Sequence, residues 1–376
     1  MTLDELLAPL SVEAFRTRHL GRAPLHLPSQ GSGQRRAMLD WRGFNRLLSQ
    51  TDHWTASTLR LLQDREAVAP SEYCREVRFA GETLLRPSPA RVEVFLSSGA
   101  SLVANEVQTL HGPISETATA LSREFAAHVG ANVYCSFQGV QAFGPHYDPH
   151  DVFAVQTEGE KVWRIYETQL DRPVDLPADD GDVRGWLERV RGPLAFEVTM
   201  RPGDVLYLPR GRFHDAVAVD SASLHVTYSV TPLHGGSLMG LIQNAAMQVP
   251  AFRDYLPASD PEDGAALQRH LRALGTILAD LITSPSFLQE VKMAQERLVP
   301  RPADFSLPHR KPLTNYRRGS GRFPAAAPDV QIAFEWCAAR DRFSLEDLIA
   351  QFDFIAPAVL REAIEAAARS GAVEPL

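Results

Sequence analysis

The central part of the chain has a hydrophobic pattern typical of β-strands. Between residues 132 and 230, short alternating or β-branched runs follow one another, with Gly, Pro and Asp between them. The runs are NVYCSF, YDPHDVFAV, KVWRIYE, LAFEVTM, GDVLYLP, FHDAVAV and SLHVTYSV. So many short strands within about one hundred residues predict a compact antiparallel barrel or sandwich. Residues 170–192 interrupt this rhythm, and we expect a loop insertion there.

Helical periodicity dominates on both sides of this region. Residues 2–7 and 113–129 are expected to be helical, and the second segment repeats its apolar residues at Ile114, Ala118, Leu121 and Phe125. After residue 231, leucines recur four, three, four and three positions apart, at Leu267, Leu271, Leu274, Leu278 and Leu281. This seam is typical of a helix that packs on another helix. It is too short to indicate a coiled coil, so an intramolecular bundle and a dimer contact fit equally well.

The C-terminal part begins with a segment, residues 300–323, that is rich in Pro, Gly and Arg. This composition predicts a surface linker, which is locally basic; an RNA contact is the weaker interpretation. From residue 331 onward we expect short helices, one of them capped by Ser344 ahead of Glu346 and Asp347. That segment contains eight acidic and four basic residues, so direct DNA binding is not expected.

The composition of the 376 residues is that of an ordinary globular chain of two or three domains, with 44% hydrophobic and 22% charged residues. The net charge of −8 does not indicate the basic surface that a nucleic-acid-binding protein carries. Cys74, Cys135 and Cys337 lie far apart, which argues against a disulfide framework or a thiolate zinc site. Asp4 and Glu5 stand where a secretory signal carries basic residues, and no apolar window reaches membrane-spanning length. We therefore expect a cytoplasmic protein.

The candidate chemistry lies in the stretch GPHYDPHDVFAV. If this stretch is a strand, alternation places His146 and Asp148 on one face. His214 follows the run GDVLYLP and a Pro-Arg-Gly turn. In neighbouring strands of a barrel, the three side chains would occupy one face of an octahedral metal and leave the other positions open, as in non-haem Fe(II) oxygenases. A His-x-Asp pair alone is common, so the prediction depends on its combination with the downstream strand and His214.

The combined motif resembles a known family. HYDPHDVFAVQTEGEKVWRIYE, followed by GDVLYLPRGRFHDAVAV and SLHVTYSVTP, is similar to the JmjC-type cupin oxygenases, specifically the ribosomal oxygenase family of 2-oxoglutarate-dependent protein hydroxylases. FRTRHLGRAPLHL also resembles the N-terminal segment of that family. The resemblance covers about residues 10–232, with a looser match beyond them.

This resemblance implies an α+β fold. Its centre is a double-stranded β-helix, that is, a cupin or jelly-roll barrel of the JmjC type, with helical N-terminal elements. A helical dimerisation region and a small winged-helix-like C-terminal domain would follow it. The expected divisions are residues 1–232 for the catalytic domain with its barrel core at about 131–232, 233–299 for the dimerisation region, 300–323 for the linker and 324–376 for the C-terminal domain.

The resemblance also implies roles for particular residues. His146, Asp148 and His214 match the Fe(II) ligands, and Lys161 matches the cation that holds the far carboxylate of 2-oxoglutarate. The residues themselves agree, because Lys161 alternates with large apolar neighbours, and an unpaired buried cation is costly. Further positions that match the lining of the co-substrate pocket are Asn132, Tyr134, Thr227 and Ser229.

Two other histidines are interpreted differently. His150 has a helical spacing from His146, but the β pattern directs it elsewhere, so we expect it to support a ligand rather than to bind metal. His225 lies on the run SLHVTYSV, where one interpretation is that it supports a ligand, but we favour a hydrogen-bonded histidine of the core.

The function implied by the family is that of a dioxygenase that uses Fe(II), 2-oxoglutarate and O2 to hydroxylate an Arg or His side chain of a ribosomal protein. Asp179, Asp180 and Asp182 would attract such a basic partner, although a solvated loop explains them equally well. We expect a homodimer without membrane contact. One alternative keeps the chemistry but acts on a small molecule or a biosynthetic peptide. Another alternative is a non-catalytic cupin-like regulatory or interaction protein. Such a protein would have no need to keep the side chains of His146, Asp148, His214 and Lys161.

Overall fold

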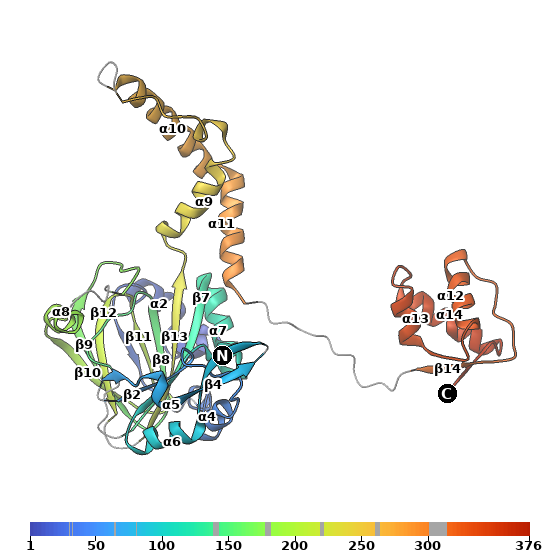
Figure 1. The fold of residues 1–376 in the computed structure, drawn as a ribbon, viewed down its shortest axis with the longest axis horizontal. Helices are drawn as coiled ribbons and strands as arrows, with labels where there is room; N and C mark the ends of the chain where they lie inside the picture. Colours follow the sequence, from blue (N-terminus) through green and yellow to red (C-terminus); the bar gives the residue numbers. More distant parts are fainter. Residues whose placement is uncertain are drawn as a thin grey trace. The chain divides into compact units, whose positions relative to one another are not determined.

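The computed structural model describes residues 1–376 except 30, 32, 64, 80, 138–142, 177–181, 219–221, 260–263 and 301–313. The chain forms two compact units, Met1–Arg301 and Pro302–Leu376 (Figure 1). We describe each unit by itself.

The first unit begins with short helices that cover a large sheet. They are α1 (Leu3–Leu7), α2 (Val12–Arg18), α3 (Gly33–Arg36), α4 (Trp41–Leu48), α5 (Pro70–Tyr73), α6 (Pro89–Ser97), the 3-10 turn η1 (Val107–Thr109) and α7 (Gly112–Phe125). Thr2 and Glu5 form a capping box at the start of α1, and Ser11 caps α2. α7 ends earlier than the periodicity predicts, because Ala126 adopts a left-handed conformation and residue 127 begins a strand.

The large sheet has eight strands in the order β1-β11-β8-β13-β7-β6-β2-β3. Their bounds are β1 (Leu25–Leu27), β11 (Val205–Leu208), β8 (Asp151–Glu158), β13 (Ser223–Pro232), β7 (Ala127–Ser136), β6 (Ser101–Ala104), β2 (Leu59–Gln63) and β3 (Glu66–Ala67). All pairs are antiparallel. Half of these strands come from the N-terminal region, where the sequence favoured helices. A separate hairpin pairs β4 (Cys74–Phe79) with β5 (Glu82–Pro87).

A three-stranded sheet completes the barrel. It has the order β10-β9-β12, with β10 (Leu194–Met200), β9 (Lys161–Gln169) and β12 (Arg212–Ala218). β8 and β9 belong to different sheets and are joined at Gly159, which has a φ of 63°. A Cβ at that position would collide with the carbonyl oxygen of Ala222, so only glycine fits this turn. The strands between residues 127 and 232 form two facing antiparallel sheets, consistent with the double-stranded β-helix that the resemblance implies.

The apolar core of this unit lies between the large sheet and the N-terminal helices. Strand β13 shows how alternation divides the two compartments, because Leu224, Val226 and Tyr228 belong to this core and are fully buried. The intervening residues face the interior of the barrel. Phe153 of β8 lies in the core beside Phe15 and Tyr207, with ring centroids 5.7 and 5.0 Å away.

The predicted loop insertion contains a helix, α8 (Val183–Val190). Asp182 begins it as the N-cap residue and accepts a hydrogen bond from the amide of Gly185. Of the acidic group that the sequence suggested for a basic partner, Asp179 and Asp180 lie outside the described residues. Asp182 is therefore explained locally, as a helix cap.

After β13 the chain forms α9 (Gly235–Ala246), the 3-10 turn η2 (Pro250–Phe252), α10 (Ala265–Thr283) and α11 (Pro285–Leu298), which contact one another (Figure 1). The structure describes every residue of α10, and none of them is buried. Among the described helices of the chain, none is both long enough and apolar enough to cross a bilayer.

The second unit has its own apolar core. It contains β14 (Asn315–Arg318), α12 (Pro328–Ala338), β15 (Arg342–Ser344), α13 (Leu345–Gln351), α14 (Pro357–Arg369) and β16 (Val373–Pro375), and the sheet has the order β15-β14-β16. Ser344 caps α13 through the amide of Asp347, as the sequence predicts. β14 lies inside the segment expected as a linker, because Tyr316 is buried against Phe343. The linker residues 301–313 lie outside the described part of the chain.

Candidate metal centre

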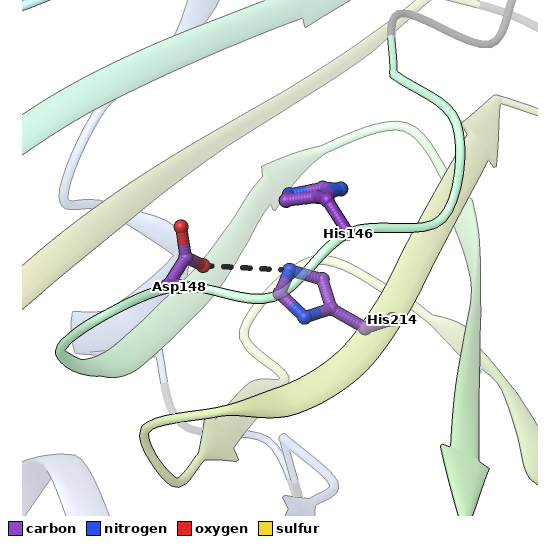
Figure 2. A group of neighbouring side chains, drawn as sticks. All are labelled: His146, Asp148 and His214. Carbon is purple, nitrogen blue, oxygen red and sulfur yellow. Dashed lines mark ion pairs between the residues drawn. The ribbon is translucent and has the colours of Figure 1, made fainter. Parts of the chain in front are cut away.

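Three side chains converge in the barrel. The structure brings His146, Asp148 and His214 together, with one potential ligand atom of each within 4.8 Å of the other two. The Nε2 atom of His214 lies 3.5 Å from a carboxylate oxygen of Asp148, and the three side chains point toward a common space (Figure 2). Two imidazoles and one carboxylate in this arrangement match the facial set of ligands that ferrous iron accepts.

The backbone holds these residues differently from the sequence prediction. His214 lies on β12, but His146 and Asp148 precede β8, which begins at Asp151. An isolated bridge aligns His146 with His214 through two hydrogen bonds of 3.0 and 2.9 Å. Pro149, which lacks an amide N–H, then interrupts the ladder. This bridge, rather than pairing within a regular strand, therefore places His146 beside His214.

Each imidazole is oriented by its own backbone. The Nδ1 atom of His146 lies 2.9 Å from the carbonyl oxygen of Gly144, and that of His214 lies 3.0 Å from the carbonyl oxygen of Arg212. A carbonyl oxygen only accepts, so Nδ1 carries the proton in both rings, and Nε2 keeps its lone pair. This tautomer is the one that a metal-binding histidine needs.

The charge states suit a divalent cation. Burial is the main cause that lowers the pKa of His214, to about 4, so its imidazole is neutral at pH 7. Burial acts to raise the pKa of Asp148, but attraction from His214, His146 and His150 outweighs it, and the pKa lies below its ordinary value. A neutral nitrogen and an ionised carboxylate are the forms that bind metal.

An apolar cluster lies behind these residues. Tyr147 stands between His146 and Asp148, Phe213 precedes His214, and the two aromatic rings are 5.4 Å apart. Both pack with Tyr166 against partly buried side chains of the insertion, namely Leu170, Trp186, Leu187 and Val190. The Tyr147 hydroxyl also donates to the carbonyl of Asp175, at 3.2 Å. The insertion thus supports both segments that carry the three converging side chains.

The three side chains open into a pocket of about 100 Å³. All the residues that the resemblance assigned to the co-substrate line it, namely Asn132, Tyr134, Lys161, Thr227 and Ser229. His150 lines it too, and its Nδ1 atom lies 3.4 Å from the carbonyl oxygen of Asp151. The sequence-based candidates therefore meet in one cavity, although they come from four strands and from the segment that precedes β8.

Lys161 is the cation of this pocket. Its side chain is buried, with a relative exposure of 3%, and its Nζ donates to the Oγ of Ser136 at 3.2 Å. Burial lowers the pKa of Lys161 to about 8. Ser136, which in turn accepts from Ser101 at 3.2 Å, was not identified from the sequence. A serine on a strand gives no signal of its own.

His225 lies in the same pocket, not among core side chains as the sequence analysis favoured. It occupies the same face of β13 as Thr227 and Ser229. The period of two along this strand was the signal that would have identified it, since His225 alternates with Thr227 and Ser229, which the resemblance assigned to the pocket. Among the described residues, nothing pairs with the Nδ1 of His225 or the Oγ1 of Thr227.

A larger cleft adjoins the pocket at His150, which lines both. Its volume is about 640 Å³. Its walls come from the ends of β9 and β13, the start of β8 and the segment after β9, with Gln169, Asp171, Arg172, Arg210, Thr231 and His234 among the polar residues. The pocket therefore opens beside a space far larger than itself.

Comparison with known proteins agrees with this site. The JmjC domain family matches residues 110–237. NO66 of Dictyostelium discoideum, a bifunctional lysine-specific demethylase and histidyl-hydroxylase, is 30% identical over 263 residues, which cover 68% of this chain and 49% of that protein. Ribosomal oxygenase 1 of Gallus gallus is 29% identical over 251 residues, or 66% of this chain and 40% of that protein. The chain thus spans less than half the length of these two relatives.

Solved structures show the same fold. YcfD, a ribosomal oxygenase from Escherichia coli in complex with cobalt and 2-oxoglutarate, aligns with a TM-score of 0.50 at 18% identity over 98% of both chains. Another structure of that protein gives a TM-score of 0.51 at the same identity. The domain match, the two relatives and the shared fold identify the chain as a member of the JmjC family of the ribosomal oxygenase type.

Proposed function

We propose that this protein is an Fe(II)- and 2-oxoglutarate-dependent oxygenase that hydroxylates a protein side chain. The observation that carries the proposal is the convergence of His146, Asp148 and His214 in a pocket that also contains the buried ammonium of Lys161. Such a pocket offers a metal-binding set and an anchor for a dianionic acid together.

In this proposal, His146 and His214 donate Nε2 to the metal and Asp148 donates a carboxylate oxygen. Lys161 pairs with the far carboxylate of 2-oxoglutarate, and Asn132, Tyr134, Thr227 and Ser229 offer hydrogen bonds to the acid. The bound iron, with 2-oxoglutarate and O2, supplies oxidative decarboxylation to succinate and CO2, coupled to hydroxylation of a carbon. The protein orients both substrates and keeps the pocket dry.

The substrate is proposed to be a polypeptide, with an Arg or His side chain of a ribosomal protein as the target. The cleft of about 640 Å³ beside the pocket supports a polypeptide over a small metabolite, because it has room for residues that flank the reacting one. The names of the relatives include a histidyl-hydroxylase and a ribosomal oxygenase, which supports this class of target.

Three further expectations from the sequence remain proposals. We infer that α9, α10 and α11 form a dimer contact, since α10 has no buried residue and Leu271, Leu288 and Met293 are exposed. The second unit is proposed to be winged-helix-like, on its three helices and three-stranded sheet. We also propose that the protein is located in the reducing cytoplasm, because its cysteines are free and buried, namely Cys74, Cys135 and Cys337.

The first test is turnover without a protein substrate. Purified protein with Fe(II), ascorbate, O2 and 2-oxoglutarate should form succinate, which can be measured by mass spectrometry. His146→Ala should reduce succinate to background. A wild-type protein that binds Fe(II) under anaerobic conditions but forms no succinate in air would contradict the proposal and favour a regulatory protein.

The second test identifies the substrate. Intact masses of ribosomal proteins from cells with and without the gene should differ by one oxygen atom in one protein, and fragmentation should assign it to an Arg or His. Unchanged ribosomal proteins together with an altered small metabolite would contradict the proposed substrate and favour the small-molecule alternative.

A further inference from the structure

His225 is a buried histidine of the pocket to which no role has yet been assigned. It is 3% exposed and lies on β13, where its neighbours Leu224 and Val226 face the apolar core. Its side chain therefore points the other way, into the pocket, on the same face as Thr227 and Ser229. A polar ring in this position faces whatever fills the pocket.

The ring of His225 is held rigidly. It stacks on the ring of Tyr134, with centroids 4.8 Å apart and planes within 5°, and Tyr134 is its direct partner across β13 and β7. The ring of Trp163 meets it edge-on at 5.5 Å. Packing on two sides leaves the imidazole little freedom to turn, so the direction of its nitrogen atoms is set before a ligand enters.

One nitrogen of this fixed ring lacks a protein partner. Among the residues that the structure describes, no atom forms a hydrogen bond with the Nδ1 of His225. Thr227, two residues along the same face, has an equally unpartnered hydroxyl. Buried polar atoms are satisfied in nearly all native structures, so two such atoms in one pocket indicate a ligand that completes them.

Charge indicates which ligand this is. Burial and then the positive charge of Lys161 hold the pKa of His225 well below its ordinary value, so the ring is neutral and the ammonium is close enough to act on it. The Lys161 ammonium donates a hydrogen bond to the hydroxyl of Ser136, which carries no charge. A carboxylate near both groups would accept from each of them, and it would also offset the burial of the cation.

We propose that His225 is a co-substrate-binding residue, which donates a hydrogen bond from Nδ1 to the carboxylate that Lys161 anchors. The assignment rests on the proposed function, because it takes 2-oxoglutarate as the occupant of the pocket. It adds a second donor at the far end of that acid, beside the ammonium.

The experiment is a calorimetric titration of 2-oxoglutarate into the full chain loaded with Co(II). His225→Phe keeps the ring that stacks on Tyr134 but has no donor, so the Kd for 2-oxoglutarate should rise about 10- to 100-fold. His225→Asn places an amide nitrogen near the position of Nδ1 and should recover most of the affinity. His225→Gln places its nitrogen near the position of Nε2 and should not.

A second ligand tests the end of the acid that is bound. 2-Oxopentanoate lacks the far carboxylate, so it should bind the parent and His225→Phe with the same Kd. The Kd for Co(II) should also stay within about twofold, because the histidine is not expected to touch the metal. A merely structural role would change both ligands and the metal alike.

The control is His111→Phe, since the Nδ1 of that histidine is also unpartnered among the described residues but lies outside the pocket. It should leave the Kd for 2-oxoglutarate unchanged. A parent protein that binds Co(II) but not 2-oxoglutarate would overturn both this assignment and the proposed function. Tight binding by the parent and by His225→Phe alike, or equal losses for both acids, would overturn the assignment alone. If His225→Phe does not fold, the difference between the Asn and Gln variants decides.

Discussion

The two faces of the large sheet bury very different side chains. The face toward the N-terminal helices packs Phe153, Val226 and Tyr228 in an apolar core. The face toward the barrel interior carries His225 and lies opposite Lys161 and His214 of the three-stranded sheet; all three side chains are nearly inaccessible to water. A single strand, β13, contributes to both. The comparison teaches that burial stabilises the fold on one face, whereas on the other it costs stability and prepares binding.

The free-energy cost of burying polar side chains appears in the pKa shifts of the residues that face the barrel interior. Burial lowers the pKa of Lys161 to about 8 and that of His214 to about 4. Each shift favours the neutral form and therefore opposes a charge in that position. A dianionic acid beside Lys161 would offset the penalty on that ammonium, whereas His214 is already in the neutral form that binds metal, so binding of the acid should stabilise the fold. Substitutions on the two faces should accordingly separate stability from activity.

The largest effect is expected for Asp148→Ala. Succinate formation should fall to background, because the variant removes the anionic member of the metal-binding set. The free energy of unfolding of the metal-free protein should fall only slightly: the lowered pKa shows that the carboxylate stabilises the fold, but its side chain is 27% exposed, so water weakens this attraction. Asp254→Ala is the matched control, because that side chain is exposed and lines neither the pocket nor the cleft, and it should keep full activity. Strong loss of stability in Asp148→Ala would break the proposed separation.

Phe153→Ala tests the opposite face. Phe153 is fully buried beside Phe15 and Tyr207, so the substitution should lower the free energy of unfolding of the first unit by about 3 to 5 kcal/mol. Urea titration followed by circular dichroism measures this loss. The Kd for Co(II) in the folded protein should remain within about twofold of the parent. Val174→Ala, on an exposed side chain, serves as the control and should change neither quantity.

Lys161→Met should weaken 2-oxoglutarate binding and stabilise the metal-free protein. Loss of the cation should raise the KM for 2-oxoglutarate by about 30-fold or more, with much less effect on iron affinity. The buried ammonium destabilises the fold below pH 8 by on the order of 3 kcal/mol. Because its folded-state pKa is below its unfolded value, this penalty diminishes as pH rises from about 8 to 10.5.

Denaturation of the parent and of Lys161→Met across this pH range measures the difference. The stability gain of the variant should be full at pH 7 and absent above about pH 10.5. In the parent, the KM for 2-oxoglutarate should rise above pH 8 as the free ammonium loses its proton. A gain in stability that is independent of pH would contradict the role of a buried charge.

The smallest effect is expected for Ser136→Ala. The hydroxyl holds the Lys161 ammonium at 3.2 Å, so its loss should raise the KM for 2-oxoglutarate by about fivefold, which corresponds to a single hydrogen bond of ~1 kcal/mol. The turnover number should stay near that of the parent. An equal fall of both kinetic constants would indicate general damage to the barrel.

Alternation and motif spacing predicted much of this molecule. Alternation predicted a barrel or sandwich from about residue 131 to residue 232, and motif spacing together with the resemblance to a known family predicted that His146, Asp148 and His214 meet. The structure departs from the prediction where long-range contacts decide. His146 is aligned by a bridge to His214 rather than by a strand, and four N-terminal strands join the large sheet through partners far along the chain.

Two other departures have simpler causes. His225 was assigned to the core because a lone buried histidine is usually satisfied there, although its alternation with Thr227 already indicated the pocket. Helix α8 was missed because Asp and Gly residues around it resemble a loop, and its apolar face is visible only once Tyr147 and Phe213 lie beneath it.

The packing of α8 against Tyr147 and Phe213 has a consequence for protein engineering. Surface insertions between strands are usually the part of an enzyme that can be exchanged to change what it accepts. Here the exchange of residues 183–190 would also loosen His146 and His214, the histidines proposed to bind iron, so we expect grafted loops to yield metal-poor protein. Libraries aimed at new substrates should vary the wall formed by Asp171, Arg172 and Val174 and leave the helix intact.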